Sequence, residues 1–315
     1  MYAKLSQQQR DLLSEYRENY IKLKNYYCNI FMSAEEKMSL FFRIENGEPF
    51  FLHQGSEPIP VYTKESEYRS NGGVYFRLDQ IHRVHNESEP RIRLGLVVPD
   101  QSYLLRKNKI HEKYFSIVAK RDKQSVDELT IESSVFPFVA FSEGGLGLEF
   151  ILFQKPFYAS TCVIDDISVD DKEGIVIILV SATSKKGGDV KYRFVFLRNY
   201  FWVLNNIVVT MGDTVVTTHN QYQQLIKNSV PLLKSSLIET NSLDGKKYNF
   251  KIFEIKEIAP GAVPLQEFDI AQFLPPDVKI GITTPSFSYF RLFCLITGLL
   301  LLVLGIYLKI KTSRK

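Results

Sequence analysis

The residues of this chain that could bind a metal are two histidines and a group of acids. His82 and His85 lie three positions apart, and residues at that spacing point to opposite faces of a strand. No Cys or further His lies close by in the sequence to complete a tetrahedral site. We therefore expect surface or structural histidines, and no metal.

An acidic cluster precedes one hydrophobic run, and it consists of Asp165, Asp166, Asp170, Asp171 and Glu173. Calcium needs six or more oxygen ligands, usually with a glycine at a sharp bend and a fixed ligand spacing. The segment DDISVDDKEG does not match the EF-hand pattern. A solvated turn is the expected structure.

Enzyme signatures are missing from the sequence. Gly144, Gly145 and Gly147 lie in EGGLGLEF, which matches neither GxxxxGK[ST] nor GxGxxG and indicates a turn. GxSxG and HExxH are absent, and no Cys–His pairing can be argued. We predict no catalytic residue and no cofactor, and a protein that is not an enzyme. An enzyme whose site is dispersed along the chain is the hypothesis kept beside this one.

One basic stretch could contact anionic lipid headgroups, and its members are Arg106, Lys107, Lys109, His111, Lys113, Lys120 and Arg121. The favoured interpretation is the outward faces of one or two strands and their connection. The net charge of +4 comes from the C-terminus, because removing the five Lys and Arg from Arg291 onward from the total of 39 leaves 34 against 35 Asp and Glu. A neutral body gives no electrostatic case for nucleic acid as a partner.

The three cysteines do not form a disulfide framework. Cys294 lies inside a hydrophobic segment, so only Cys28 and Cys162 could pair. Buried apolar side chains are the favoured interpretation of both, and the redox compartment stays open.

The segment Leu5–Tyr27 predicts an amphipathic helix that packs on a sheet. Its apolar residues recur at spacings of 3, 4, 3 and 4, which is one stripe of a helix. Ser6 and Gln9 form a capping box at its start.

After this helix, the hydrophobic period changes to two, which is typical of antiparallel strands with one dry face. The alternation is found in four places: Met38 to Ile44, Val74 to Leu78, Ile92 to Val98, and Val190 to Phe196. The nearly continuous run Gly174–Thr183 predicts a central strand. Turns fall between these runs at Asn46-Gly47, Asn71-Gly72-Gly73, Gly187-Gly188-Asp189, Met211-Gly212-Asp213 and Asp244-Gly245. The segment 136–153 is expected to form a short helix and loop over one end of the sheet.

The C-terminal segment predicts a transmembrane helix. Leu292–Leu308 holds 17 residues without a charge, which span about 26 Å, and the flanking aromatic residues extend this to a hydrocarbon core of about 30 Å. The residues expected to form the anchor are Tyr289, Phe290, Leu292, Leu299, Leu300, Leu301, Leu302, Tyr307, Lys309 and Lys311. We predict a β domain over 1–273, a Pro-containing linker over 274–288, the helix over 289–308 and a basic tail over 309–315.

The orientation of this helix has two interpretations. The larger basic cluster follows the helix and should stay cytoplasmic, which places the body outside the cytoplasm. Met1 to Lys24 is polar and carries no apolar export signal. Either the body is cytoplasmic and the protein is tail-anchored, or the chain begins downstream of the true start. We expect the second.

The order of these segments resembles a known family. The helix LSQQQRDLLSEYRENYIKLKNYY is followed by MSLFFRI, by SNGGVYFRLDQIHRV and by a string of hairpins. This layout resembles the LolA-like half-barrel of lipoprotein carriers over most of residues 5–275. The segments PLLKSSLIETNSLDGKKYNFKIFEI and PGAVPLQEFDIAQFLPP are similar to the ends of membrane-anchored envelope proteins of planctomycete bacteria. The resemblance implies a curled antiparallel sheet, but it carries no motif that transfers a site.

The alternating strands predict the function. A curled sheet with one helix leaves an apolar trough, which a membrane lipid, an acylated protein or an apolar segment of another envelope protein could occupy. The residues expected to line it are Phe42, Phe76, Leu94, Phe194 and Phe196. The alternative is a structural or assembly protein that engages a protein partner through its sheet edges or its N-terminal helix.

Overall fold

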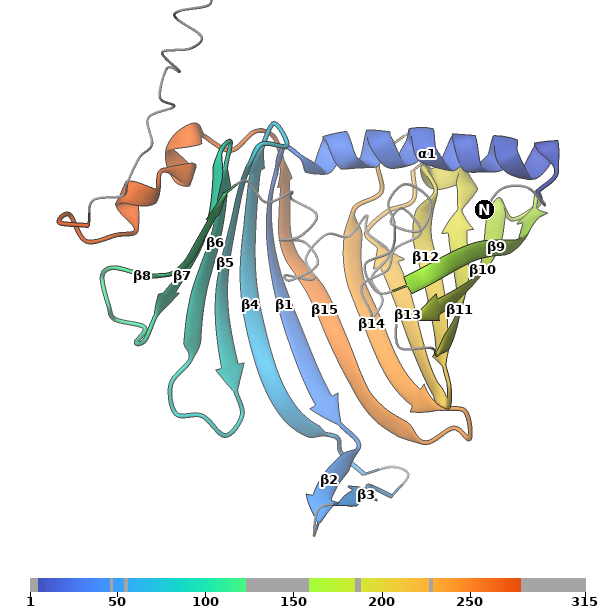
Figure 1. The fold of residues 1–315 in the computed structure, drawn as a ribbon, viewed down its shortest axis with the longest axis horizontal. Helices are drawn as coiled ribbons and strands as arrows, with labels where there is room; N and C mark the ends of the chain where they lie inside the picture. The colour runs from blue at the N-terminus through green and yellow to red at the C-terminus, as the bar shows by residue number, and fades with distance from the viewer. Residues whose placement is uncertain are drawn as a thin grey trace, which may run out of the picture. The chain divides into compact units, whose positions relative to one another are not determined.

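One antiparallel sheet of thirteen strands dominates the computed structural model, which describes residues 5–45, 48–53, 56–122, 159–184, 188–226 and 229–278. The strand order is β8-β7-β6-β5-β4-β1-β15-β14-β13-β12-β11-β10-β9, and the sheet curls along this order (Figure 1). The predicted fold class, mainly β with a curled antiparallel sheet and an N-terminal helix, is confirmed. The strands of the sheet are β1 (Ile30–Leu40), β4 (Ile59–Asn71), β5 (Tyr75–Val84), β6 (Arg91–Val98), β7 (Gln101–Lys107), β8 (Ser116–Asp122), β9 (Ala159–Asp170), β10 (Ile175–Ser184), β11 (Asp189–Leu197), β12 (Val203–Met211), β13 (Thr214–Tyr222), β14 (Leu233–Ser242) and β15 (Lys247–Pro260).

The predicted strand from Met38 to Ile44 is broken at Phe41. β1 ends at Leu40, and a separate two-stranded sheet follows, made of β2 (Phe42–Glu45) and β3 (Glu48–Phe51). A register shift between Met38 and Ser39 disturbs the pairing of β1 with β4 just before the break. The alternation is interrupted at the break, because Leu40, Phe41 and Phe42 are consecutive apolar residues.

The run Gly174–Thr183 forms β10, which is second from one edge of the sheet and not central. Its apolar residues point to both faces, but only one face is dry. Ile178 is completely buried on that face, whereas Leu179, its neighbour on the other face, is 36% exposed. A continuous apolar run therefore overestimated how deeply this strand lies.

The N-terminal helix is α1 (Gln7–Tyr27), and it lies across one end of the strands (Figure 1). The capping box is confirmed: the Gln9 amide N–H donates to Ser6 Oγ at 3.2 Å, and the Ser6 amide N–H donates to Gln9 Oε1 at 3.0 Å. Leu13 and Tyr16 of its apolar stripe are buried in a cluster with strands β9 to β14. Near the other end of the helix, Tyr26 packs on a second cluster that includes Ile30 and Phe76. The helix thus packs on the sheet, as predicted, across one end of its strands.

We call the face on which α1 packs the inner face, and the opposite one the outer face. Residues directly opposite each other in an antiparallel pair lie on the same face, so the register assigns every strand residue to one of them. On the outer face, β5 and β6 contact η2 (Leu265–Phe268), which is followed by η3 (Ile270–Gln272). There Tyr75 packs against Phe268 with ring centroids 5.6 Å apart.

Several predicted features lie outside the described residues. These are the transmembrane helix and basic tail at 289–315, most of the linker, Cys294, the glycines 144–147, and the segment 136–153. The Asn46-Gly47 turn also falls outside them. Within the part of the chain that the structure describes, no helix is both long enough and apolar enough to cross a membrane.

Candidate ligand-binding face

A single row of side chains can be followed across the inner face from one side of the sheet to the other. Each member lies directly opposite the next, and the order is Ile167, Ile178, Phe194, Ile207, Thr218, Ile238, Lys251, Met38, Tyr62 and Val84. The first four members, on β9 to β12, are apolar. Polar residues begin at Thr218 on β13. The row is therefore apolar over β9 to β12 and mixed polar and apolar from β13 onward.

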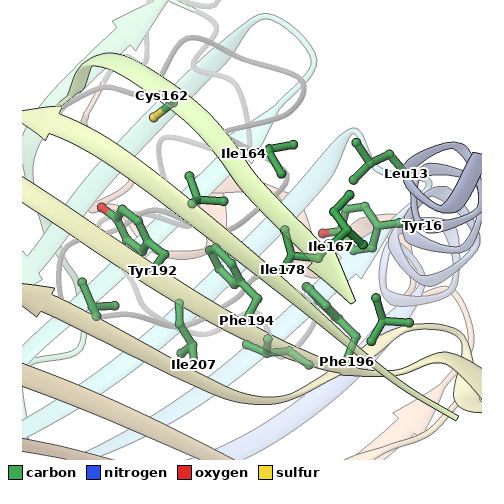
Figure 2. Close-up of a cluster of buried hydrophobic side chains, with 14 of the residues drawn as sticks. Leu13, Tyr16, Cys162, Ile164, Ile167, Ile178, Tyr192, Phe194, Phe196 and Ile207 are labelled. Carbon is green, nitrogen blue, oxygen red and sulfur yellow. The ribbon is translucent and has the colours of Figure 1, made fainter. Parts of the chain in front are cut away.

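Three aromatic rings on β11 form the centre of the apolar half. Tyr192 and Phe194 stack with centroids 5.8 Å apart and an interplanar angle of 10°, and Phe194 and Phe196 follow at 6.1 Å and 15°. They are alternate residues of one strand, so their side chains share a face. Burial raises the pKa of Tyr192 to about 12. Figure 2 shows the three rings among the aliphatic side chains of β9, β10 and β12.

One carboxylate of α1 binds the helix to the apolar half of the sheet. Glu15 of α1 accepts hydrogen bonds from Arg198 Nε at 3.0 Å, from Arg198 Nη2 at 2.7 Å and from Trp202 Nε1 at 2.8 Å. Both partners lie on the connection between β11 and β12. The Arg198 guanidinium lowers the pKa of Glu15. Tyr16 then packs edge-on against Trp202, with centroids 5.8 Å apart, at the end of the aromatic cluster.

Buried hydroxyl and amide groups follow on β13 and β14. Thr218, Asn220 and Ser236 are at most 6% exposed, and Asn220 lies directly opposite Ser236. Thr218 Oγ1, Asn220 Oδ1 and Ser236 Oγ have no hydrogen-bond partner in the described structure, although Asn220 Nδ2 donates to the Leu204 carbonyl at 2.9 Å. A buried polar atom without a partner costs about 1–3 kcal/mol. We call these three residues the polar patch.

Charged residues occupy the inner face further along, on β1, β4 and β5. Glu36 is 6% exposed and pairs with Lys64 at 2.5 Å, and it also accepts a hydrogen bond from the Tyr62 hydroxyl. Burial raises the pKa of Glu36, but Lys64 and Tyr62 outweigh this effect, and the net result is a lowered pKa. His82, opposite Lys64, packs edge-on against Tyr62 with ring centroids 4.7 Å apart. This half of the face can therefore contact charged or hydrogen-bonding groups.

The five residues predicted to line the trough do not all lie on one face. Phe76, Phe194 and Phe196 are buried on the inner face. Leu94 is completely buried, and its pairing with Asp79 places it on the outer face. Phe42 belongs to the β2–β3 hairpin, where it packs against Phe51. The alternation in β6 was correct, but it could not tell which face the apolar residues would occupy.

The sequence interpretation missed the polar patch and the Glu36–Lys64 pair. Each is assembled only when two strands pair, β13 with β14 and β1 with β4, so no local motif marks them. β13 (TVVTTHNQY) is polar over most of its length, so its sequence does not mark Thr218 and Asn220 as members of a buried face.

The other candidate residues are placed as follows. His82 lies on β5 and His85 just after it, and no group of three His, Cys, Asp or Glu within the described ranges could hold a metal ion. The acidic cluster spans the end of β9 and an exposed turn, where Asp170 Oδ1 accepts from the backbone amides of Lys172 and Glu173. Cys28 and Cys162 are thiols, and Cys162 is buried on the inner face. The basic stretch forms the β7–β8 hairpin, two strands and their connection as predicted, but Arg106 lies on the inner face and not on the outward one.

An outer-face cavity of about 530 Å³ lies over β1, β4, β5 and β15. Its charged groups are largely engaged with each other. Asp79 binds Arg69 and Arg77, both at 2.8 Å, while Lys256 binds Glu35 at 3.1 Å. We infer no ligand for this cavity.

Comparison with known proteins gives structural neighbours only. No family model matches the chain, and no curated protein matches it. A domain described as an outer membrane lipoprotein-sorting protein, from Vibrio parahaemolyticus, matches with a TM-score of 0.39 and 10% identity, over 81% of this chain and 95% of that one. LprF from Mycobacterium bovis matches with a TM-score of 0.25 and 11% identity, over 79% and 96%. A 12:0-ACP thioesterase from Umbellularia californica matches with a TM-score of 0.12 and 11% identity, over 74% and 78%.

The first of these neighbours is described as a lipoprotein-sorting protein domain. The resemblance to planctomycete proteins has no counterpart in these comparisons and stays a prediction.

Proposed function

We propose that this chain is a non-enzymatic binding domain whose inner face holds an amphipathic apolar ligand. The ligand is a lipid, an acylated protein or an apolar segment of an envelope protein. The observation that supports this proposal most is the composition of the inner face. Aromatic and aliphatic side chains cover it on β9–β12, and the polar patch follows on β13 and β14. A ligand with an apolar chain and a hydrogen-bonding linkage matches both parts.

The apolar half of the inner face supports the proposal because it offers apolar surface that a ligand chain could cover. Phe194 and Ile207 are completely buried, and each Å² of apolar surface that is kept from water contributes about 25 cal/mol. Because these side chains are covered in this structure, a ligand reaches them only when the face opens. The free energy of binding then equals the difference between the free energy of the contacts with the ligand and that of the contacts within the closed protein.

The polar patch supports the proposal through its unpaired atoms. Thr218 and Ser236 each carry a buried hydroxyl that can donate to an ester or amide carbonyl, the group that links an acyl chain to a lipid or a protein. A fold that needed only stability would favour apolar side chains of the same shape at these positions. A hydrogen bond to the linkage would satisfy them.

We also propose that residues 289–308 anchor the domain in a membrane, with 1–273 as the β domain, 274–288 as the linker and 309–315 as the basic tail. The body then lies outside the cytoplasm, and the alternative is a cytoplasmic, tail-anchored body. Protease treatment of intact cells distinguishes the two. Digestion of the β domain from outside, in cells whose cytoplasmic proteins stay intact, is the expected result, whereas full protection would place the body in the cytoplasm.

A second candidate function is assembly with a protein partner, and the edge strands favour it. Val118 on β8 is 57% exposed and Val163 on β9 is 42% exposed, and an edge strand with apolar side chains can pair with another chain. Crosslinking in membranes would then give one fixed protein neighbour. The binding proposal predicts crosslinks to lipid instead.

The test of the binding proposal uses the full chain, purified in mild detergent. We expect mass spectrometry to find a co-purifying lipid or acyl species, and a fluorescent fatty-acyl probe to bind the delipidated protein saturably. In T218V/S236A, we expect probe binding to weaken about tenfold, which corresponds to about 1.4 kcal/mol. The folded state should be as stable as in the wild type or more stable, since two buried unpaired hydroxyls are removed.

The matched control is T217V/S235A. These residues are the immediate neighbours of the patch and point to the outer face, opposite Glu239 and Glu254. The control should bind the probe as the wild type does. Equal probe affinity of T218V/S236A and the wild type would show that the polar patch does not contact the ligand. The absence of any saturable acyl binding would overturn the proposed function.

A further inference from the structure

Three arginines meet on the inner face at the end of the sheet formed by β6 and β7. Arg93 lies directly opposite Arg106, and Arg91 lies two residues before Arg93 on the same strand and the same face. Their side chains line one cavity of about 270 Å³. The β7 member belongs to the basic stretch of the sequence, whereas the β6 pair comes from the motif RIRLGL.

This arrangement is unfavourable for the sheet by itself. Like charges directly opposite each other on neighbouring strands are destabilising. Arg93 and Arg106 form no ion pair or side-chain hydrogen bond with any residue of the described ranges. Arg91 is engaged by Glu87, with its Nε 2.9 Å from Glu87 Oε2.

The surroundings keep the charge of this site positive. His82 lies opposite Arg91, and Lys64 lies opposite His82. Burial first, and then the charges of Lys64, Arg91 and Arg93, lower the pKa of His82. Among the residues that the structure describes, the nearby carboxylates are Glu87, which pairs with Arg91, and Glu36, which pairs with Lys64. Within that part of the chain four cations face two carboxylates, and the unmatched charge belongs to Arg93 and Arg106.

We propose that Arg91, Arg93 and Arg106 bind a phosphate group. A guanidinium presents N–H donors in a planar fork that matches phosphate oxygens, and two opposed forks can share a tetrahedral dianion. Bound phosphate would also remove the repulsion across β6 and β7. The phosphate is either a free phosphate or the headgroup of an anionic lipid, because both present the same oxygens.

The evidence for the phosphate site is independent of the evidence for the proposed function. No residue of the aromatic half or the polar patch contributes to it, so either site can exist without the other. A phosphate site at one end of the inner face, together with an apolar half at the other, would suit a phospholipid that lies across the face.

The experiment uses the full chain in non-ionic micelles and two probes at constant ionic strength, inorganic phosphate and dihexanoylphosphatidic acid. Calorimetric titration should show saturable binding of at least one probe. In R93Q/R106Q, we expect the dissociation constant to rise at least tenfold, the effect of losing charge-assisted hydrogen bonds. Equal affinity for both probes would identify free phosphate as the ligand, whereas binding of phosphatidic acid alone would identify a lipid headgroup.

The matched control is K37Q/R83Q, which removes the same charge from the outer face, where Lys37 pairs with Glu35 and Arg83 pairs with Glu65. Affinity in this control should stay within twofold of the wild type. R93Q/R106Q should unfold at a higher urea concentration than the wild type, because the repulsion is gone, so weak binding would not reflect misfolding. R93K/R106K keeps the charges without the forks and should also bind more weakly.

Two results would overturn the site. One is the absence of saturable binding of either probe. The other is an equal change in R93Q/R106Q and K37Q/R83Q, which would show attraction to overall charge and no site. Loss of phosphate binding in R93Q/R106Q with unchanged acyl-probe binding would support this site and leave the proposed function unaffected.

Discussion

Replacing Glu15 with alanine should loosen α1 from the sheet. Trp202 is 1% exposed, and its indole N–H donates to Glu15 Oε1 at 2.8 Å. Without that acceptor, the N–H is left buried and unpaired, which costs about 1–3 kcal/mol. The Arg198–Glu15 pair has side chains that are 34% and 36% exposed, so solvent screening limits its contribution to about 1 kcal/mol or less. We expect E15A to lower the free energy of unfolding by about 2–4 kcal/mol.

The assay is urea unfolding of the full chain in non-ionic micelles, followed by far-UV circular dichroism and by the fluorescence of Trp202, the single tryptophan of the chain. With a slope of about 2–3 kcal/mol per molar urea, the midpoint should fall by roughly 1 M. E15Q keeps an acceptor oxygen for the indole and should lose only about 1 kcal/mol.

The matched control is E18A, one turn along the same helix, where the side chain is exposed. It removes the same charge and should change the free energy of unfolding by less than about 0.5 kcal/mol. A change in E15A as small as that in E18A would refute the idea that this carboxylate fastens the helix.

Two further predictions concern stability. Gly174 has a left-handed backbone with φ of +66°, so G174A should lower the free energy of unfolding by about 1–2 kcal/mol. A further loss is expected because the new Cβ would lie 2.1 Å from Asn199 Nδ2. G212A, with φ of +55° and nothing within 4 Å, should show the backbone part alone in the same urea titration, and equal losses would show that Asn199 moves freely. The pKa of Glu36 is lower in the folded protein than in the unfolded chain, so its ionised carboxylate stabilises the fold. This stabilisation is complete above the ordinary glutamate pKa of about 4.3 and is lost as the pH falls through the lower pKa of the folded protein. Urea midpoints between pH 7 and pH 3 should therefore fall less steeply in E36Q than in the wild type, and parallel slopes would contradict this assignment.

Local patterns predicted the strands and the helix because both depend on side-chain periodicity. The alternate residues Val190, Tyr192, Phe194 and Phe196 are all buried on one face of β11. Ser6 and Gln9 marked the beginning of α1 within two residues. These features are decided by neighbours in the sequence, so they can be read from it.

Strand order could not be predicted in the same way. β1 is the first strand of the chain, yet it lies between β4 and β15, and its pairing with β15 joins residues more than 200 positions apart. Such pairing leaves no local pattern. It also decides which face each strand turns inward, which is why Leu94 was assigned to the wrong face while Phe76 was not.

The site was harder to predict than the fold because its polar members come from many strands. Thr218 and Ser236 meet only when β13 pairs with β14, and Arg93 meets Arg106 only when β6 pairs with β7. The sequence showed a basic stretch around Arg106, but nothing in it linked that residue to the alternating arginines of β6.

The most direct test of the central claim is to map where an acyl chain binds. The full chain in micelles is incubated with a fatty acid that carries a photoreactive diazirine on its chain, irradiated and digested, and the labelled peptides are identified by mass spectrometry. We predict labels on inner-face residues of β9 to β12, such as Ile178, Phe194 and Ile207, and competition by unlabelled lipid. Labels confined to the outer face or to the edge strand β8, or labels that unlabelled lipid does not reduce, would contradict the account.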